Sequence, residues 1–137
     1  MKNFLKSLAL AIGSLVSGPL SDFADAAVVR VIDGDTVVIE RTVVRLEGID
    51  TPETWRWRCS AEQVLGLKAK ARLEVLLDGR DVTFVGGKRD RWGRTLGTVY
   101  ADGEDVAERL IAEGLAVRWK SGPKAKAERL AIWCPAG

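Results

Sequence analysis

Short runs of apolar and β-branched residues, separated by turn residues, occur in two groups along the chain. Three runs follow one another closely after residue 27, and two more lie after residue 80. Runs of this length, bounded by Asp, Gly and Pro, are typical of strands. We expect five strands, at residues 28–32, 36–39, 42–46, 81–85 and 95–101.

A different pattern, with apolar residues three and four positions apart, predicts helices after the third and the fifth strand. Ser60 and Gln63 have the spacing of a capping box, so Ser60 is expected to cap the first helix. Asp105 is expected to cap the second helix, and Gly114 to end it. We expect helices at residues 60–77, 105–113 and 123–132, and a short extended piece at 117–119.

The order of these elements predicts the fold class. Three strands, a helix, two strands and further helices favour a small, strongly curled, five-stranded OB-fold-like Greek-key barrel, a β-barrel with helices (α+β) in which three helices pack against the strands. An open α+β sheet made of the same elements is the alternative. The chain has 137 residues, which is enough for one hydrophobic core and not for two.

The N-terminal stretch predicts export. Lys2 and Lys6 precede an apolar run rich in Gly and Ser, and Ala24 and Ala26 form a small-x-small cleavage pattern. A membrane anchor is the alternative, although the apolar run is short for a bilayer span. We expect a signal peptide at residues 1–26 and one domain at 27–137, periplasmic or secreted, monomeric, and without stable membrane association after cleavage.

The cysteine and histidine counts limit the chemistry. Cys59 and Cys134 are the only cysteines, and in an oxidising compartment they would most simply pair with each other; two free thiols in a cytosolic protein are the alternative. The sequence has no histidine, which excludes Ser-His and Cys-His catalysis and His-ligated zinc. Catalysis would therefore depend on carboxylates, arginines, lysines and a hard metal ion.

One stretch concentrates such groups. Asp35, Asp50 and Glu53 lie at chain turns, and Arg45 lies inside an apolar strand. Pairing of the neighbouring strands would bring the strand-ending carboxylates to one end of a sheet. The alternative is that the carboxylates only form turns and that Arg45 pairs with Glu47 at the surface. The formal net charge of +2 does not by itself indicate a polyanionic partner.

Four motifs then occur in order: V-I-D-G-D-T at residues 31–36, V-R-L-E-G-I-D-T-P-E-T at 44–54, D-R-W-G-R at 90–94 and Y-A-D-G at 100–103. In this combination the chain closely resembles the staphylococcal nuclease (thermonuclease) family. The resemblance implies a five-stranded oligonucleotide-binding barrel with three helices. It also implies a Ca²⁺-dependent phosphodiesterase that cuts DNA and RNA, with single strands favoured, and leaves 3′-phosphates.

The resemblance assigns roles to individual residues. Asp35 and Asp50 resemble the calcium-ligating carboxylates, with the backbone carbonyl of Thr51 as a further ligand. Glu53 resembles the carboxylate beside the attacking water, the general base. Arg45 and Arg94 resemble the two arginines that hold the scissile phosphate. Forked, permanently charged guanidinium groups suit that task.

Some positions depart from the family pattern. Trp92 stands where many relatives have tyrosine, and Arg91 stands where lysine is more usual. After Gly114, where the family often has tyrosines, Trp119 is the nearest aromatic residue. We expect Arg91, Trp92 and Trp119 to bind substrate, because an indole ring stacks on a base although it lacks the phenol's hydroxyl.

Directly after Glu53 the chain reads T-W-R-W-R-C. Interleaved tryptophans and arginines suit single-stranded nucleic acid, with bases stacking and phosphates pairing. The alternative is that a tryptophan packs over a disulfide or under the helix, and we expect a mixture in which one of Trp55 and Trp57 is exposed.

Three functional hypotheses follow. The first is a calcium-dependent nuclease of broad specificity, which the complete set of five catalytic-type residues favours. The second is a non-catalytic nucleic-acid-binding OB-fold module. The third is an exported domain in which calcium is only structural.

Overall fold

The structure, a computed structural model, describes residues 13 and 27–136. The signal peptide expected at residues 1–26 lies outside these residues, apart from residue 13. The described chain forms eight strands and three helices. In chain order they are β1 (Val29–Asp33), β2 (Thr36–Ile39), β3 (Thr42–Leu46), β4 (Ile49–Asp50), α1 (Ser60–Leu77), β5 (Val82–Arg89), β6 (Thr95–Ala101), β7 (Glu104–Asp105), α2 (Val106–Ala112), β8 (Val117–Arg118) and α3 (Pro123–Trp133).

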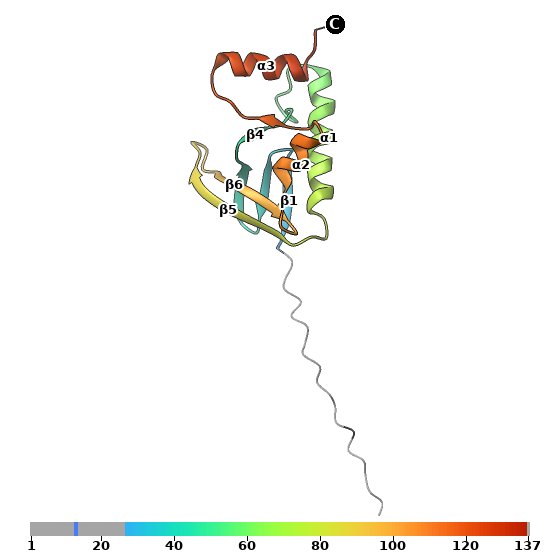
Figure 1. Cartoon of the computed structure of the whole chain (residues 1–137), viewed down its shortest axis with the longest axis vertical. Coiled ribbons are helices and arrows are strands. Elements are labelled where there is room, and N and C mark those ends of the chain that lie inside the picture. The colour runs from blue at the N-terminus through green and yellow to red at the C-terminus, as the bar shows by residue number, and fades with distance from the viewer. Residues whose placement is uncertain (1–12, 14–26, 137) are drawn as a thin grey trace, which may run out of the picture.

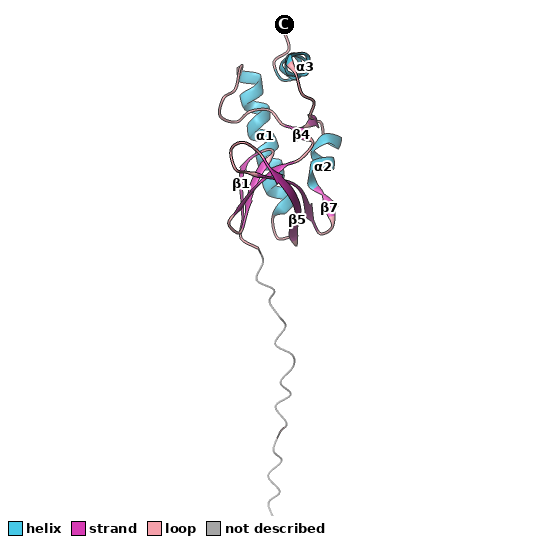
Figure 2. Cartoon of the chain, turned by 90° about the vertical axis from the view of Figure 1, so that its left-hand side faces the viewer, coloured by secondary structure: helices cyan, strands magenta, loops and turns pink. Residues whose placement is uncertain are grey.

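The main sheet has the order β1-β2-β3-β6-β5, and β7 adds to β6. The first three strands form an antiparallel meander, β3 and β6 run parallel, and β5 and β6 form an antiparallel hairpin. A second sheet consists of β4 and β8 alone. The five predicted strands and three helices are all present, and the OB-fold-like arrangement is confirmed (Figures 1 and 2).

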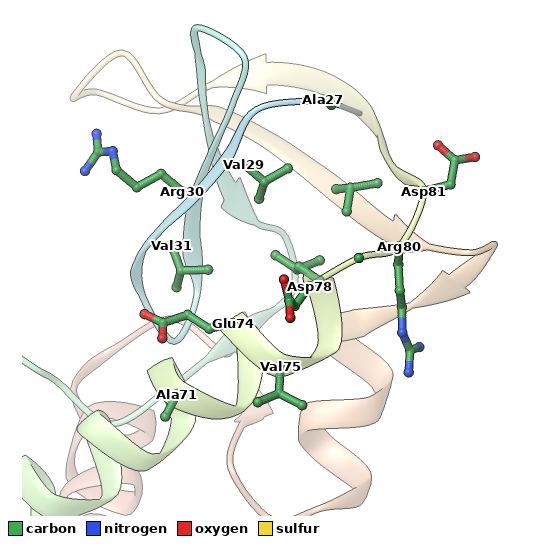
Figure 3. A pocket seen from close by; sticks show the side chains of 13 residues that line it. Ala27, Val29, Arg30, Val31, Ala71, Glu74, Val75, Asp78, Arg80 and Asp81 are labelled. Atoms are coloured by element: carbon green, nitrogen blue, oxygen red, sulfur yellow. The ribbon is translucent and has the colours of Figure 1, made fainter. Parts of the chain in front are cut away.

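The curled sheet does not close into a barrel by hydrogen bonds. Within the described chain, β1 and β5 end the ladder and do not pair with each other. An open groove lies between them and the C-terminal end of α1 (Figure 3). Apolar side chains such as Val29, Val31 and Val75 line this groove together with charged ones such as Asp78 and Arg80. The fold therefore combines OB-fold-like strand order with one open side.

The hydrophobic core lies between the inner face of the sheet and helices α1 and α2. β-branched residues of the strands supply one wall, and leucines at helical spacing supply the other, as expected for a half-buried sheet covered by amphipathic helices. The fully buried apolar side chains include Val37, Val44, Leu46, Ile49, Leu73, Val99 and Leu110. Helix α3 lies beyond this core, beside β4 and β8 (Figure 1).

Several local predictions are corrected. Cys59, not Ser60, is the N-cap of α1, and its sulfur accepts a hydrogen bond from the backbone N–H of Glu62. Strand β5 extends four residues beyond the predicted end at Val85, because it pairs with β6 as far as Arg89 through an irregularity in the ladder. The short strands β4 and β7 were not predicted, because a strand of two residues is too short to show an alternation of apolar and polar positions.

Cys59 and Cys134 form a disulfide, with their Cα atoms 6.0 Å apart. The bond joins the N-cap of α1 to the C-cap of α3, and so ties the end of the chain to the loop that follows Glu53. No helix among the described residues is long and apolar enough to cross a membrane.

Candidate active site

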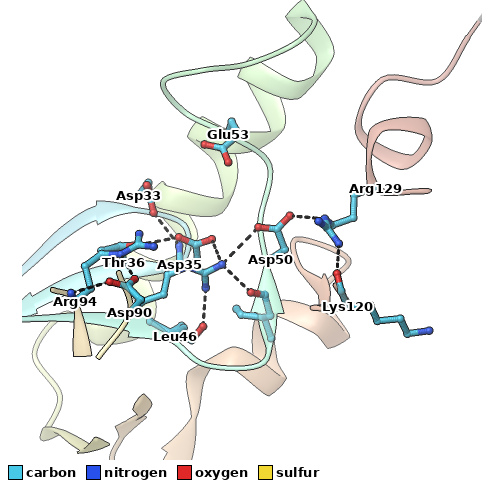
Figure 4. A network of polar contacts seen from close by, with 12 residues as sticks. Asp33, Asp35, Thr36, Leu46, Asp50, Glu53, Asp90, Arg94, Lys120 and Arg129 are labelled. Atoms are coloured by element: carbon cyan, nitrogen blue, oxygen red, sulfur yellow. Dashed lines mark hydrogen bonds and ion pairs between the residues drawn. The ribbon is translucent and has the colours of Figure 1, made fainter. Parts of the chain in front are cut away.

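Arg45 is the centre of a cluster of ion pairs at one end of the sheet. Figure 4 shows the network of polar contacts around Asp35 and Asp50. Its Nη2 lies 3.1 Å from Oδ2 of Asp35 and 3.5 Å from Oδ1 of Asp50. The guanidinium also donates to the backbone carbonyls of Leu46 and Ile49, at 2.6 and 3.0 Å. Arg45 therefore faces the two predicted calcium ligands, and the alternative pairing with Glu47 is wrong.

Local backbone structure explains how these residues meet. Thr36 and Arg45 are paired across the β2–β3 hairpin, so Asp35, directly before β2, lies beside Arg45. The backbone N–H of Leu46 donates to the carbonyl of Asp35 at 2.8 Å. Gly48 then reverses the chain with a φ of +78°, a conformation that favours glycine, and β4 returns Asp50 to the same end of the sheet.

Asp50 has a second cationic partner that the sequence did not reveal. Nε of Arg129, on α3, lies 3.0 Å from Oδ2 of Asp50, and Arg129 also donates to the carbonyl of Lys120 at 2.8 Å. Arg129 follows Asp50 by 79 positions on a helix with an ordinary charged pattern. No sequence signal distinguished it from the other arginines of the chain.

Asp33, which was not among the predicted site residues, is a further member of the site. Its carboxylate accepts a hydrogen bond from the backbone N–H of Asp35 at 3.2 Å. Burial, followed by the hydrogen bonding and negative charge of Asp35, raises the pKa of Asp33 to about 7. The two-residue spacing of an Asp-Gly-Asp turn was the available signal, since such a turn places both carboxyl groups close together.

The negative charge of the carboxylates at this site exceeds the positive charge of the nearby cations. Partial burial, and then the negative charge of Asp35, raises the pKa of Asp50 even though Arg45 and Arg129 oppose this. Partial burial, followed by the charges of Asp35 and Asp50, also raises the pKa of Glu53. A raised pKa makes a carboxylate a better proton acceptor near neutral pH.

Helix α1 fixes the backbone of Glu53. The N–H of Glu53 points to the buried carboxylate of Glu62, 3.4 Å away. Gly66, one helical turn further on, lies so close to the carbonyl of Glu53 that a Cβ atom at Gly66 would be only 2.5 Å from that oxygen. The side chain of Glu53 remains open to solvent at the end of the cluster (Figure 4).

Arg94 lies outside the ion-pair cluster. Its Nε contacts Oδ2 of Asp90 at 2.6 Å, and its backbone N–H donates to the other oxygen of Asp90. β3 and β6 are parallel neighbours, and Val44 of β3 pairs with Thr95 of β6. Arg94 directly precedes Thr95, so it lies alongside β3, the strand that carries Arg45. The structure thus places Arg45 on β3 and Arg94 directly before the neighbouring strand β6, with Arg94 held by Asp90.

The predicted substrate-binding aromatics are exposed at two other points of the surface. Trp92 is 65% exposed, and the guanidinium groups of Arg91 and Arg94 lie 4.1 and 5.2 Å from its ring centroid. Trp119 is 52% exposed and follows β8, and its backbone N–H donates to the carbonyl of Gly48 at 2.9 Å. Both rings are available for stacking, since neither is packed into the core.

A family model described as "Staphylococcal nuclease homologue" matches residues 43–134. The chain belongs to this family. The match includes Arg45, Asp50, Glu53 and Arg94, whereas Asp35 lies before it.

Three curated relatives of this staphylococcal nuclease homologue illustrate the range of names in the family. "Endonuclease YncB" of Bacillus subtilis (strain 168) is 34% identical over 129 residues, which cover 79% of this chain and 61% of that protein. "Micrococcal nuclease" of Shigella flexneri is 40% identical over 102 residues, covering 71% of this chain and 54% of that protein. "Succinoglycan biosynthesis protein ExoI" of Rhizobium meliloti (strain 1021) is 38% identical over 97 residues, covering 64% and 48%. The chain spans about half the length of these relatives.

Calcium is the metal that this family membership suggests. Among residues 27–136, no three Asp, Glu, Cys or His side chains gather closely enough to hold a metal by themselves. Asp35 and Asp50 nevertheless suit a hard cation, because both carboxylates reach the same nitrogen of Arg45 and the site has excess negative charge. Ca²⁺ takes six to eight oxygen ligands, so the carbonyl of Thr51, waters and a phosphate oxygen would complete such a set.

Proposed function

We propose that the protein is a calcium-dependent nuclease that hydrolyses phosphodiester bonds of DNA and RNA with broad specificity and leaves 3′-phosphates. One observation carries this proposal: Arg45 lies between Asp35 and Asp50 at one end of the sheet, and the charges of these two carboxylates act on Glu53. A cation, a base and a pair of carboxylates for a hard metal are the groups that phosphodiester hydrolysis needs. The family relatives named as nucleases support the same activity.

The residues of the site divide the reaction between them. Arg45 binds a non-bridging oxygen of the scissile phosphate, and Arg94 exchanges its contact with Asp90 for a second oxygen. Glu53 accepts the proton of the attacking water, a role that its raised pKa suits. Asp35, Asp50 and the carbonyl of Thr51 would hold calcium, which supplies positive charge near the phosphate when bound.

Other parts of the proposal concern the substrate and the location. Arg91, Trp92 and Trp119 bind the nucleotides on either side of the scissile bond, and single strands are favoured because their bases are free to stack. The protein acts as a monomer in the periplasm or outside the cell, without stable membrane association once the signal peptide at residues 1–26 is removed. The disulfide between Cys59 and Cys134 supports an oxidising compartment.

The test is a cleavage assay with defined ends. The protein is incubated with single-stranded DNA or with RNA, in Ca²⁺, in Mg²⁺ or with a chelator, and the product ends are identified by their response to a 3′-phosphatase. We expect cleavage in Ca²⁺, loss of cleavage with the chelator, and 3′-phosphate ends. Glu53→Gln and Arg94→Ala should each lose activity by about 10²- to 10³-fold, the usual cost of one group that stabilises a transition state.

Matched controls come from the same stretch of chain. Glu47→Gln and Arg41→Ala change exposed residues of the same types outside the cluster, so both variants should retain full activity. Full activity of a protein that carries both Glu53→Gln and Arg94→Ala would refute the nuclease mechanism. Binding of oligonucleotides without any cleavage would favour the non-catalytic binding module, and calcium-dependent melting alone would favour a structural metal.

A further inference from the structure

The loop between Glu53 and α1 presents two tryptophans to solvent. Trp55 is 84% exposed and Trp57 is 45% exposed, so the expectation that only one of them is exposed is wrong. Arg56, between them, is also exposed. Large aromatic side chains on the surface of a folded domain are a signal of binding when they are grouped with cations.

We propose that residues 54–58, which we call the arm, form an additional binding site for single-stranded nucleic acid next to the candidate active site. In this site Trp55 and Trp57 stack on successive bases, and Arg56 pairs with the phosphate between them. This inference rests on the proposed nuclease function, because it extends the path of the substrate beyond the scissile phosphate.

The arm is held in place at its base by a buried carboxylate. Glu62 is fully buried and accepts hydrogen bonds from the backbone N–H of Arg58 at 2.7 Å and from its guanidinium at 2.7 and 3.1 Å. Arg58 is thereby committed to Glu62, and it is not a phosphate ligand as the sequence pattern had favoured. This leaves Arg56 as the cation of the arm that is available to a phosphate.

The other attachments of the arm are covalent and steric. Cys59, directly after the arm, is bonded to Cys134, and Glu53, just before it, is packed against Gly66. Both ends of a short segment are therefore fixed, which lowers the entropy that the arm loses when a ligand binds. An exposed tryptophan pair on a fixed loop is a pre-organised stacking surface.

The chemistry of the arm favours a single strand over a duplex. In a duplex the base faces are stacked within the helix and cannot reach an indole ring, whereas every base of a single strand has a free face. Trp55 is two residues from Glu53, so the arm lies beside the candidate general base, within reach of a strand that is bound at the cluster. A duplex would contact Arg56 only through phosphates, without the contribution of stacking.

The experiment measures binding and cleavage with oligonucleotides of increasing length. Binding of fluorescently labelled oligothymidylates of two and eight nucleotides is measured by anisotropy, with the full chain, in chelator so that no cleavage occurs. The variants are Trp55→Ala with Trp57→Ala, and Arg56→Gln. Leu67→Ala, which truncates an exposed apolar side chain of α1 outside the arm, is the matched control.

We expect the double tryptophan variant to bind the eight-nucleotide strand about 100-fold more weakly, since loss of one stacked base costs on the order of tenfold. The dinucleotide, whose two bases and one phosphate fit the arm alone, should lose affinity to a similar extent. Arg56→Gln should lower the slope of log affinity against log salt by about 0.7, the value for one phosphate contact in a single strand. Leu67→Ala should match the unmodified protein.

An unchanged affinity of the double tryptophan variant for either length would overturn the proposed site. Equal losses for an eight-base-pair duplex would also overturn it, because they would indicate a general electrostatic effect. The binding assay does not depend on catalysis, so it decides the role of the arm even if the protein cleaves nothing. When cleavage is observed, the double variant should raise KM for long strands far more than it lowers kcat.

Discussion

Gly66→Ala tests whether α1 positions the candidate general base. Gly66 is buried in the second turn of α1, where glycine is the less favourable residue and alanine would stabilise a helix by about 1 kcal/mol. At this position, however, an added Cβ would lie 2.5 Å from the carbonyl oxygen and 2.7 Å from the carbonyl carbon of Glu53, and 3.0 Å from the carbonyl oxygen of Pro52. The atoms in the way belong to the backbone and cannot rotate aside.

The size of the displacement follows from these distances. A carbon and an oxygen without a covalent bond approach to about 3.3 Å, so the backbone of Glu53 has to move by about 0.8 Å. A misplacement of about 1 Å in a catalytic group costs roughly 100-fold in rate. The fold itself should change little, because overpacking costs about 1–3 kcal/mol and the helix recovers about 1 kcal/mol of that.

We therefore expect Gly66→Ala to lower kcat on single-stranded DNA by about 100-fold, with a small change in KM and in the melting temperature. Lys68→Ala, on the exposed face of the same helix, is the control and should have normal kcat. If Gly66→Ala acts through Glu53, it should have little further effect in a Glu53→Gln background, as a double-mutant cycle shows. A folded Gly66→Ala protein with kcat within about twofold of normal would refute the reasoning.

Three further predictions concern the disulfide, the buried ion pair and the central arginine. Reduction of the Cys59–Cys134 bond should lower the free energy of unfolding by about 4 kcal/mol, measured by urea denaturation with and without reductant. As the control, a protein in which both cysteines are changed to alanine should not respond to reductant. Burial alone would raise the pKa of Glu62, but the hydrogen bonds from Arg58 outweigh burial and lower that pKa. The ion pair therefore stabilises the fold above about pH 4, and this stabilisation is lost as the pH falls further. Glu62→Gln should make the free energy of unfolding less dependent on pH in the acid range, and an unchanged dependence would contradict the assignment. Arg45→Lys keeps the charge but loses the fork that reaches two carboxylates and two carbonyls, so kcat should fall by about 10²- to 10³-fold in the cleavage assay, and near-normal activity would rule out a forked contact with phosphate.

Local elements could be predicted from the sequence because short-range physics determines them. β2, β3, β6 and α1 have the predicted bounds, since β-branched runs and helical spacing are both strong in these segments. The hairpin that pairs Thr36 with Arg45 follows from the same pattern, and with it the meeting of Asp35 and Arg45. The prediction was wrong at the N-cap of α1, where the sulfur of Cys59 takes the position that a serine hydroxyl usually has.

The parts of the site that depend on tertiary packing could not be predicted. Arg129 reaches Asp50 only because α3 lies beside β4 and β8, and no local pattern marks that contact. Glu62 has the sequence context of an exposed helix residue, yet it is fully buried, and its carboxylate is contacted by the backbone and guanidinium of Arg58 and by the sulfur of Cys134. The pKa of Asp33 rises for a similar reason, since burial at the sheet end is a property of the assembled fold.

Two separate parts of the fold thus form the candidate site. The sheet places Arg45, Asp35 and Asp50 through strand pairing, and most of their contacts are to one another or to nearby backbone. Helix α1 places Glu53 through Glu62 and Gly66, and the same helix carries the disulfide at its N-cap. A change in the first turns of α1 should therefore affect the proton acceptor and the arm together, while the ion-pair cluster keeps its geometry. Comparison of calcium affinity with kcat in Gly66→Ala separates these two parts: kcat should fall while the affinity for calcium stays within about threefold, and a parallel loss of both would show that the helix also holds the carboxylates of the sheet.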